Sequence, residues 1–309
     1  MINIISGAVS LGLLWAIMAL GVYITYRILD YADLTVEGSI VTGAAIAAKL
    51  ISMEINPFVA TLVAFAGGMA AGVVTGLLNT KLRIPGILSG ILSMIGLYSI
   101  NIKIMGKPNI TLLKAETVFT VLSKSKATVL IVGGAMAVIL VVALYMFLST
   151  SLGNAVRATG NNEKMARAMG INTDTMKILG LSISNGLVAL SGALIAQSQG
   201  YSDMNMGQGA IVIGLASVII GEVLYHKNGM LNKLSSVLVG AVAYRVIIAW
   251  VIDWGMDPLN LKLFTAITVA VALSMPRIKK YAMNKINAVE KKVSDSKKIK
   301  IMEKEETTI

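Results

Sequence analysis

Long apolar runs separated by short polar breaks fill the chain from its start to about position 275. A helix needs about 20 apolar residues to cross a membrane, and roughly nine runs approach that length. They are residues 4–25, 39–51, 58–78, 84–100, 127–148, 178–197, 210–224, 231–252 and 259–275. The second is too short for a full crossing, so we expect the region 26–51 to be broken or tilted and partly buried in protein. The pattern predicts an all-α, polytopic transmembrane fold with roughly nine membrane segments.

The chain divides into a long, mostly apolar region and a short charged tail. Residues 1–276 are predicted to form the transmembrane domain, and residues 277–309 form a Lys-rich tail with no apolar run long enough to enter a membrane. Such a tail favours a frayed helix or disordered chain. The first run lacks a basic start and a small-residue cleavage site, so it is predicted to be a retained span.

The polar, net-basic stretch 149–177 stands between two strongly apolar runs. Either Asn161 or Asn162 can cap a short helix, because its side-chain oxygen can accept a free N–H of the first turn. Glu163 in the first turn and Arg167 near the last have the signs that the helix dipole favours. The predicted helix has roughly two turns, too few to be stable alone. It must therefore pack against its flanks or against a partner.

The end and the surface of this helix are also predicted. Gly170 can adopt the left-handed conformation that ends a helix. Met165, Ala166 and Met169 lie three or four residues apart and are predicted to share one apolar face with a charged rim. The alternative interpretation is an ordinary cytoplasmic loop that carries one surface helix.

Composition excludes several classes of protein. The 309 residues have a mean hydropathy of +0.77, with 56% hydrophobic and only 14% charged residues, which indicates an integral membrane protein. In such a protein a net charge of +11 belongs first to the loops that set orientation and does not indicate nucleic-acid binding. Lys and Arg counts favour placing 149–177 and the tail in the cytoplasm, while an odd span number would put the N-terminus outside.

No enzymatic chemistry is indicated. The chain has no phosphate-binding loop of the Gly-x-x-x-x-Gly-Lys-Ser/Thr type, and its one histidine, His226, falls in a short turn. A single histidine makes neither a metal site nor a catalytic triad. The absence of Cys excludes disulfides and thiolate sites.

Small residues recur every fourth position in the run 58–78. Gly68, Gly72 and Gly76 follow Ala64 at this spacing, which lets two helix backbones approach closely in lipid. We interpret these glycines as helix-packing positions.

Polar residues inside apolar runs are candidates for a translocation path, because they are costly in a membrane. Glu222 and Arg245 are expected to form a structural ion pair, with gating or solute contact as the alternative. Ser184 and Ser191 can share a face, which either lines a water-filled path or forms hydrogen bonds across helices. Asn185 belongs to the same polar series.

The letters RATGNNEKMARAMGI resemble the cytoplasmic coupling segment of ABC-importer permeases in the group that carries ribose, other sugars and branched-chain amino acids. The stretch DLTVEGS at 33–39 resembles an early break in the same group, in the branch linked with aromatic amino acids. The alternative is that Thr35 or Ser39 simply caps the next helix, and the two interpretations are compatible. A third likeness lies within 207–229, so the resemblance covers most of residues 30–230.

The resemblance implies a function for the chain. It would be the permease subunit of an ATP-driven importer that passes a small solute, an amino acid and possibly an aromatic one. A sugar or nucleoside permease is the runner-up, and an ion-coupled secondary transporter is the rival from another class. The residues implied to contact the ATPase are Arg157, Gly160, Asn161, Asn162, Glu163, Met165, Ala166, Arg167 and Gly170.

Partners and location follow from the same resemblance. Cytoplasmic ATPase subunits would bind ATP and Mg²⁺, so this subunit would hold no cofactor. An extracytoplasmic binding protein would deliver the solute, and a second permease copy, as a homodimer or a close relative, would complete the path. The chain would be a multi-pass protein of a bacterial-type plasma membrane, in contact with lipid and not with nucleic acid. The resemblance also implies ten segments with both ends inside, so the expected number of membrane segments is about 9–10.

Overall fold

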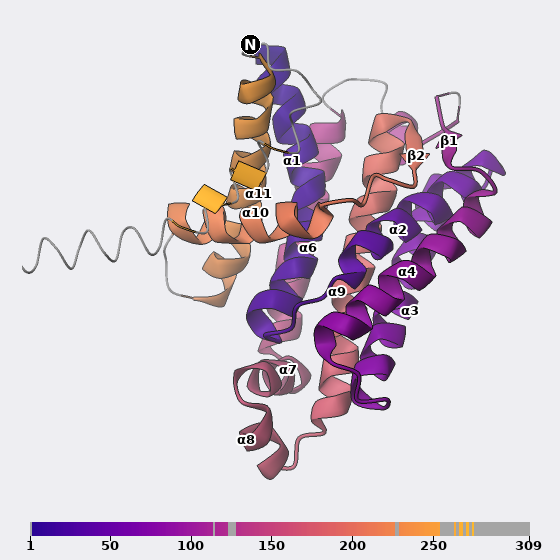
Figure 1. The fold of residues 1–309 in the computed structure, drawn as a ribbon. Coiled ribbons are helices and arrows are strands. Elements are labelled where there is room, and N and C mark those ends of the chain that lie inside the picture. Colours follow the sequence, from indigo (N-terminus) through magenta and orange to yellow (C-terminus); the bar gives the residue numbers. More distant parts are fainter. Residues whose placement is uncertain are drawn as a thin grey trace, which may run out of the picture.

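The computed structural model describes residues 2–113, 115–122, 128–225 and 229–253, together with single positions between 263 and 274. These residues form a bundle of helices (Figure 1). The elements are α1 (Ile2–Tyr23), the π-helical turn η1 (Ile24–Ile28), α2 (Thr35–Ser52), α3 (Pro57–Thr80), α4 (Gly86–Met105), β1 (Asn109–Thr111), α5 (Val118–Leu122), α6 (Thr128–Ser149), α7 (Ser151–Asn161), α8 (Glu163–Ala168), α9 (Thr173–Gln199), β2 (Tyr201–Asp203), α10 (Ala210–Leu224) and α11 (Met230–Asp253).

Within the described residues, 7 helices are long and apolar enough to cross a membrane: α1 continued by η1, α2, α3, α4, α6, α9 and α11. This confirms the all-helical, multi-span fold. Two predicted spans need correction, because α2 has 18 residues and begins at Thr35, whereas α10 has only 15 residues. Since a crossing takes about 20 residues, α10 alone is too short. Most of the predicted span 259–275 lies outside the described residues, as do His226 and the tail.

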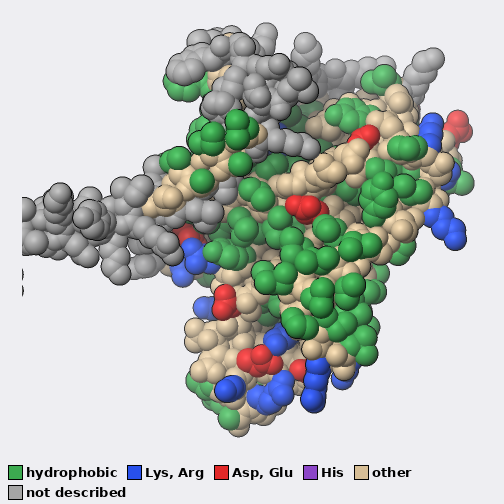
Figure 2. Space-filling model, viewed as in Figure 1, with side chains coloured by type: hydrophobic (Ala, Val, Ile, Leu, Met, Phe, Trp, Pro, Cys, Tyr) green, Lys and Arg blue, Asp and Glu red, His purple; other side chains and the backbone are tan. Residues whose placement is uncertain are grey.

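Charged side chains lie at both ends of the bundle. Figure 1 shows the N-terminus and the strands at one end and helices α7 and α8 at the other. In Figure 2, hydrophobic side chains cover the middle of the visible face, while Lys, Arg, Asp and Glu gather at the end formed by α7 and α8 and also lie at the upper right, towards the strands. This is the distribution expected of a body that spans a membrane.

Two three-residue strands join loops that are far apart in sequence. Strand β1 pairs with β2 in antiparallel register, with Ile110 opposite Ser202. Helix α4 continues beyond the predicted run 84–100 to Met105, and the strand β1 follows. The loop after α4 is thereby fastened to the loop after α9.

A short irregular segment, residues 29–34, connects η1 to α2. Asp33 is buried there; its Oδ1 accepts from Thr35 N at 2.9 Å and its Oδ2 accepts from Asn185 Nδ2 at 2.7 Å. Ser39 Oγ donates to Asn185 Oδ1 at 2.6 Å. The expectation that Thr35 or Ser39 caps the helix is therefore wrong: the N-cap residue is Leu34, and the N–H of Thr35 is satisfied by the side chain of Asp33, because an aspartate side chain reaches the N–H two residues later.

Helix α9 is mostly buried, with α1, α2 and α3 packed around it. The three predicted packing glycines, Gly68, Gly72 and Gly76, lie where α3 meets α9. A Cβ at Gly72 would lie 2.2 Å from Leu181 O, and a Cβ at Gly68 or Gly76 would also meet α9 at 2.9 Å or less. Real side chains do not tolerate such distances, so the two backbones are in direct contact.

Gly72→Val should therefore destabilise the protein. Overpacking a close helix contact costs about 1–3 kcal/mol, and here it meets backbone, which cannot rotate away. The thermal unfolding midpoint and the folded yield in detergent measure the effect. Gly96→Ala on α4 is the control, because no atom lies within 4 Å of its Cβ. Equal midpoints for Gly72→Val and the wild type would contradict the close contact.

Candidate functional site

The stretch 149–177 forms two short helices and the start of a long one. Thr150 begins α7, with its Oγ1 accepting from Gly153 N at 3.2 Å. Asn162 begins α8, with its Oδ1 accepting from Met165 N at 3.0 Å. Of the two asparagines proposed as caps, Asn162 is thus the one that caps α8, and Asn161 ends α7. The sequence predicted one helix here and missed α7.

Helix α8 ends as the sequence predicts. Gly170 has a φ of 82°, the left-handed conformation that glycine adopts without strain. Ile171 N then donates back to Ala166 O at 3.0 Å, which satisfies a carbonyl of the last turn. After Asn172, whose side chain accepts from Thr175 N at 3.2 Å, the chain continues as α9.

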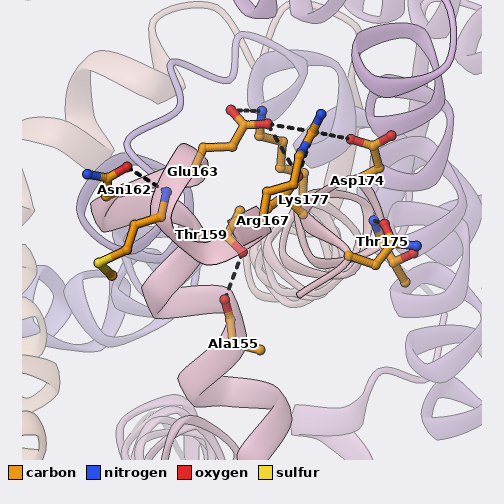
Figure 3. A network of polar contacts seen from close by, with 11 residues as sticks. Ala155, Thr159, Asn162, Glu163, Arg167, Asp174, Thr175 and Lys177 are labelled. Atoms are coloured by element: carbon orange, nitrogen blue, oxygen red, sulfur yellow. Dashed lines mark hydrogen bonds and ion pairs between the residues drawn. The ribbon is translucent and has the colours of Figure 1, made fainter. Parts of the chain in front are cut away.

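Polar contacts fasten α8 to the first turns of α9 (Figure 3). Glu163 Oε2 accepts from Lys177 Nζ at 2.7 Å, and Glu163 Oε1 lies 3.2 Å from Arg167 Nη2. The same Arg167 nitrogen lies 2.7 Å from Thr173 Oγ1 and 3.2 Å from Asp174 Oδ1. We call Glu163, Arg167, Thr173, Asp174 and Lys177 the α8–α9 clamp. It joins a helix of 6 residues to one of 27.

The clamp lowers the pKa of the Glu163 carboxylate. The hydrogen bond from Lys177, together with the charges of Lys177 and Arg167, lowers the pKa of Glu163 against the opposing effect of desolvation. Glu163 therefore stays ionised near neutral pH and holds both cations.

The apolar surface of α8 differs from the one expected. Met165 and Met169 are 46% and 74% exposed, but Ala166 is fully buried. The three residues do not share an outward face, because Ala166 packs inward where the helix meets the rest of the protein. Two flexible methionines thus lie exposed at the end of the bundle, beside the exposed Lys164.

Helix α7 rests on η1. A Cβ at Gly160 would lie 1.9 Å from Ile28 O, so only glycine fits at this contact. A polar cleft of about 710 Å³ opens beside it and is lined in part by Arg27, Arg157 and Lys233. Helix α7 is therefore in direct backbone contact with η1, which continues α1.

A comparison with protein families identifies the chain's family. Residues 4–273 match the family described as branched-chain amino acid transport system / permease component. The chain belongs to this family. It is an ABC transporter permease subunit, a multi-pass membrane protein of the kind that sits in the bacterial inner membrane and a transport component, not a catalyst.

Individual proteins are similar to this permease to different degrees. The tyrosine transport system permease protein of Clostridioides difficile is 43% identical over 92% of this chain and 95% of its own length. The ribose import permease protein RbsC of Escherichia coli K12 is 27% identical over 74% and 71%. One solved ABC transporter structure, of the metal-chelate type in an inward-facing conformation, covers 89% of this chain and 85% of its own, with 15% identity and a TM-score of 0.49.

Two serines of the permease that were candidates for a path are buried between helices. Ser184 Oγ donates to Gly21 O at 2.8 Å, and Ser191 Oγ donates to Leu14 O at 2.8 Å. Both side chains are fully buried. Of the two alternatives for this face, these are hydrogen bonds across helices, and they join α9 to α1.

The expected ion pair between Glu222 and Arg245 is wrong. Glu222 pairs with Arg27 of η1, whereas the Arg245 guanidinium carbon lies 4.2 Å from the centre of the Trp15 ring. The end of α10 that carries Glu222 meets α11 before Arg245, because a Cβ at Gly221 would lie 2.1 Å from Ser236 O. A cation over an aromatic face recovers part of its lost hydration.

Sequence reasoning missed several side chains that hold the helices of the permease together. It identified no partner for Arg27, and it did not identify the roles of Thr173, Asp174 and Lys177 in the clamp. The available signal was the spacing of Lys177 from Glu163, but such a pair forms only if the chain reverses at Gly170. Local patterns do not show that reversal.

Asn162→Ala should loosen α8 selectively. Loss of an N-cap costs about 1 kcal/mol, equivalent to an exchange rate roughly fivefold higher for the amides of α8. Hydrogen exchange read by mass spectrometry on the purified permease measures it. Asn161→Ala is the matched control, because Asn161 does not cap α8. Equal exchange in both variants would contradict the assigned cap.

The clamp should weaken in acid. Because its pKa is lowered on folding, Glu163 stabilises the folded state above its ordinary pKa of 4.5, and this contribution is lost as pH falls through the lowered value. At pH 7 the amides of α8 should exchange faster in Glu163→Gln than in the wild type, and the difference should vanish in the acid range. A difference that stays constant down to pH 3 would show that the carboxylate charge is not what holds α8.

Proposed function

We propose that this permease is the membrane-spanning subunit of an ATP-driven importer whose solute is an amino acid, with tyrosine as the first candidate. The support is the 43% identical relative, a tyrosine transport permease that aligns over 92% of the chain. An extracytoplasmic binding protein would deliver the solute at the end that carries β1 and β2. Separate ATPase subunits would bind ATP and Mg²⁺, and two permease copies would form the path between them.

The α8–α9 clamp is the single observation that supports a transfer of force from the ATPase subunits to the membrane spans. A helix of 6 residues is too short to be stable alone, yet it is fastened to α9 by two cations and two carboxylates. Its exposed Met165 and Met169 can seat in an apolar groove of an ATPase subunit, because methionine adapts to irregular surfaces. A push on α8 then reaches α9 through the clamp and α1 through α7.

Helix α9 can pass this push to the other spans. It contacts α1, α2 and α3 without intervening side chains at several points, as at Gly72. Closure of an ATPase pair would thus rock a set of spans as a rigid body between outward and inward openings.

A sugar is the second candidate solute. The ribose import permease of Escherichia coli supports it, although its identity is lower, at 27% over 74% of the chain. Uptake of radiolabelled L-tyrosine into vesicles that carry the permease, its ATPase and its binding protein separates the two. L-Phenylalanine should compete and ribose should not; competition by ribose alone would favour the sugar.

Coupling is tested by a double variant, Arg167→Glu with Gly170→Val. The first change reverses the charge in the clamp, and the second forces a β-branched residue into a left-handed conformation at a φ of 82°. Uptake should fall to background while the amount of permease in the membrane stays normal. Lys81→Glu, an exposed charge reversal in the turn between α3 and α4, is the control and should transport normally. Normal uptake by the double variant would refute the lever mechanism.

A further inference from the structure

A cavity of about 450 Å³ lies between α2, α4 and the segment that precedes α10. Its polar side chains include Glu37 from α2, Tyr98 and Asn101 from α4, and Gln208 from the segment before α10, while Met94 and Met204 are among its apolar ones. Cavities that hold small molecules typically have volumes of about 300–1,000 Å³. We call it the α2–α4 cavity.

Irregular backbone reaches this cavity at the depth of the spanning helices. Helix α10 begins only after Gly209, and Gly209 N donates to Glu37 Oε1 at 3.0 Å. A Cβ at Gly207 would lie 2.1 Å from Glu37 O, so this backbone touches the first turn of α2. Non-helical backbone within a membrane is tolerated where it is buried in protein or lines a polar cavity, and transporters place binding sites at such breaks.

The cavity contains hydrogen-bonding capacity that the protein does not use. Asn101 is 1% exposed; its Nδ2 donates to Gly38 O at 3.2 Å, but its Oδ1 has no partner among the described residues. Glu37 receives the Gly209 N–H on one carboxylate oxygen, which leaves the other available. A buried amide oxygen without a partner is costly, and a ligand that donates a hydrogen bond removes that cost.

We propose that the α2–α4 cavity binds the transported solute on its way through the membrane, and that the solute is a zwitterionic amino acid with an aromatic side chain. The inference rests on the proposed function and names the residues that contact the solute. The ammonium group of the solute pairs with Glu37 and donates to Asn101 Oδ1. The aromatic ring of the solute packs against Tyr98 and Met94, contacts that aromatic and thioether groups favour.

Charge argues against an anionic solute. Among the described residues that line the cavity, Glu37 is the one carboxylate and there is no Lys or Arg. A phosphorylated solute with no ammonium group would be repelled by Glu37, whereas a zwitterion has no net charge and its ammonium group can pair with this carboxylate. The apolar walls favour a body larger and less polar than a pentose.

The absence of Cys from the chain permits a direct test. Ser99 lines the cavity and is exposed, so Ser99→Cys places a near-isosteric thiol at its wall. In vesicles that carry the full importer, L-tyrosine should slow the reaction of this thiol with a small methanethiosulfonate reagent. Ser149→Cys is the control: Ser149 is exposed at the end of α6, next to α7, and L-tyrosine should not protect a thiol there. Ribose should protect neither.

A second substitution tests the contact itself. Glu37→Gln keeps an oxygen for Gly209 N but removes the charge, so it is expected to fold. In the Ser99→Cys background it should raise the L-tyrosine concentration for half-protection about 10- to 100-fold, the usual loss for a hydrogen bond to a charged group. Glu54→Gln, in the exposed turn after α2, should leave that concentration unchanged.

The outcomes separate this inference from the proposed function. If the wild-type importer takes up no L-tyrosine, the proposed substrate is wrong, and the assignment of the cavity falls with it. If it takes up L-tyrosine but the thiol at position 99 is not protected, or Glu37→Gln leaves half-protection unchanged, the cavity is not the binding site while the proposed function stands.

Discussion

Direct contact between the backbone of α9 and its neighbours is the constraint on which the rest of the structure depends. In lipid, helices gain little from hydrophobic burial, so they associate through close contacts and hydrogen bonds. Glycines such as Gly43, Gly72 and Gly192 remove side chains where α2, α3 and α9 meet, and Ser184 and Ser191 tie α9 to α1. A helix held on three sides in this way moves only together with the helices around it.

Because α9 is held rigidly, an element fixed to α9 at the polar end of the bundle is held rigidly too. Helix α8 is short and largely solvent-exposed, but the α8–α9 clamp fastens it to α9. The buried contact of Asn185 with Asp33 links α9 to the break before α2, and the α2–α4 cavity begins one turn beyond that break, at Glu37. Motion that enters at α8 thus has a continuous route, through α9 and α2, to a cavity within the spanning region.

Sequence alone predicted the parts that rest on local chemistry. Asn162 and Gly170 mark the two ends of α8, and the sequence predicted both because caps and left-handed glycines act within a few residues. The spacing of apolar runs located most spans. Prediction from sequence failed where the outcome depends on which helices become neighbours. Glu222 pairs with Arg27, 195 residues earlier, and no pattern along the chain distinguishes this partner from Arg245. Helix α7 was missed because it has no apolar run, and its place depends on contact with η1.

The proposed coupling requires that an ATPase subunit binds α8 on the cytoplasmic side. The most direct measurement is cross-linking from a single cysteine at Met169, which is 74% exposed at the tip of this element, in membranes that contain the importer. We expect a short cross-link from position 169 to the ATPase subunit, with a yield that changes when ATP is added. A cysteine there that reacts with a membrane-impermeant reagent from outside the cell, and forms no cross-link with the ATPase, would contradict it.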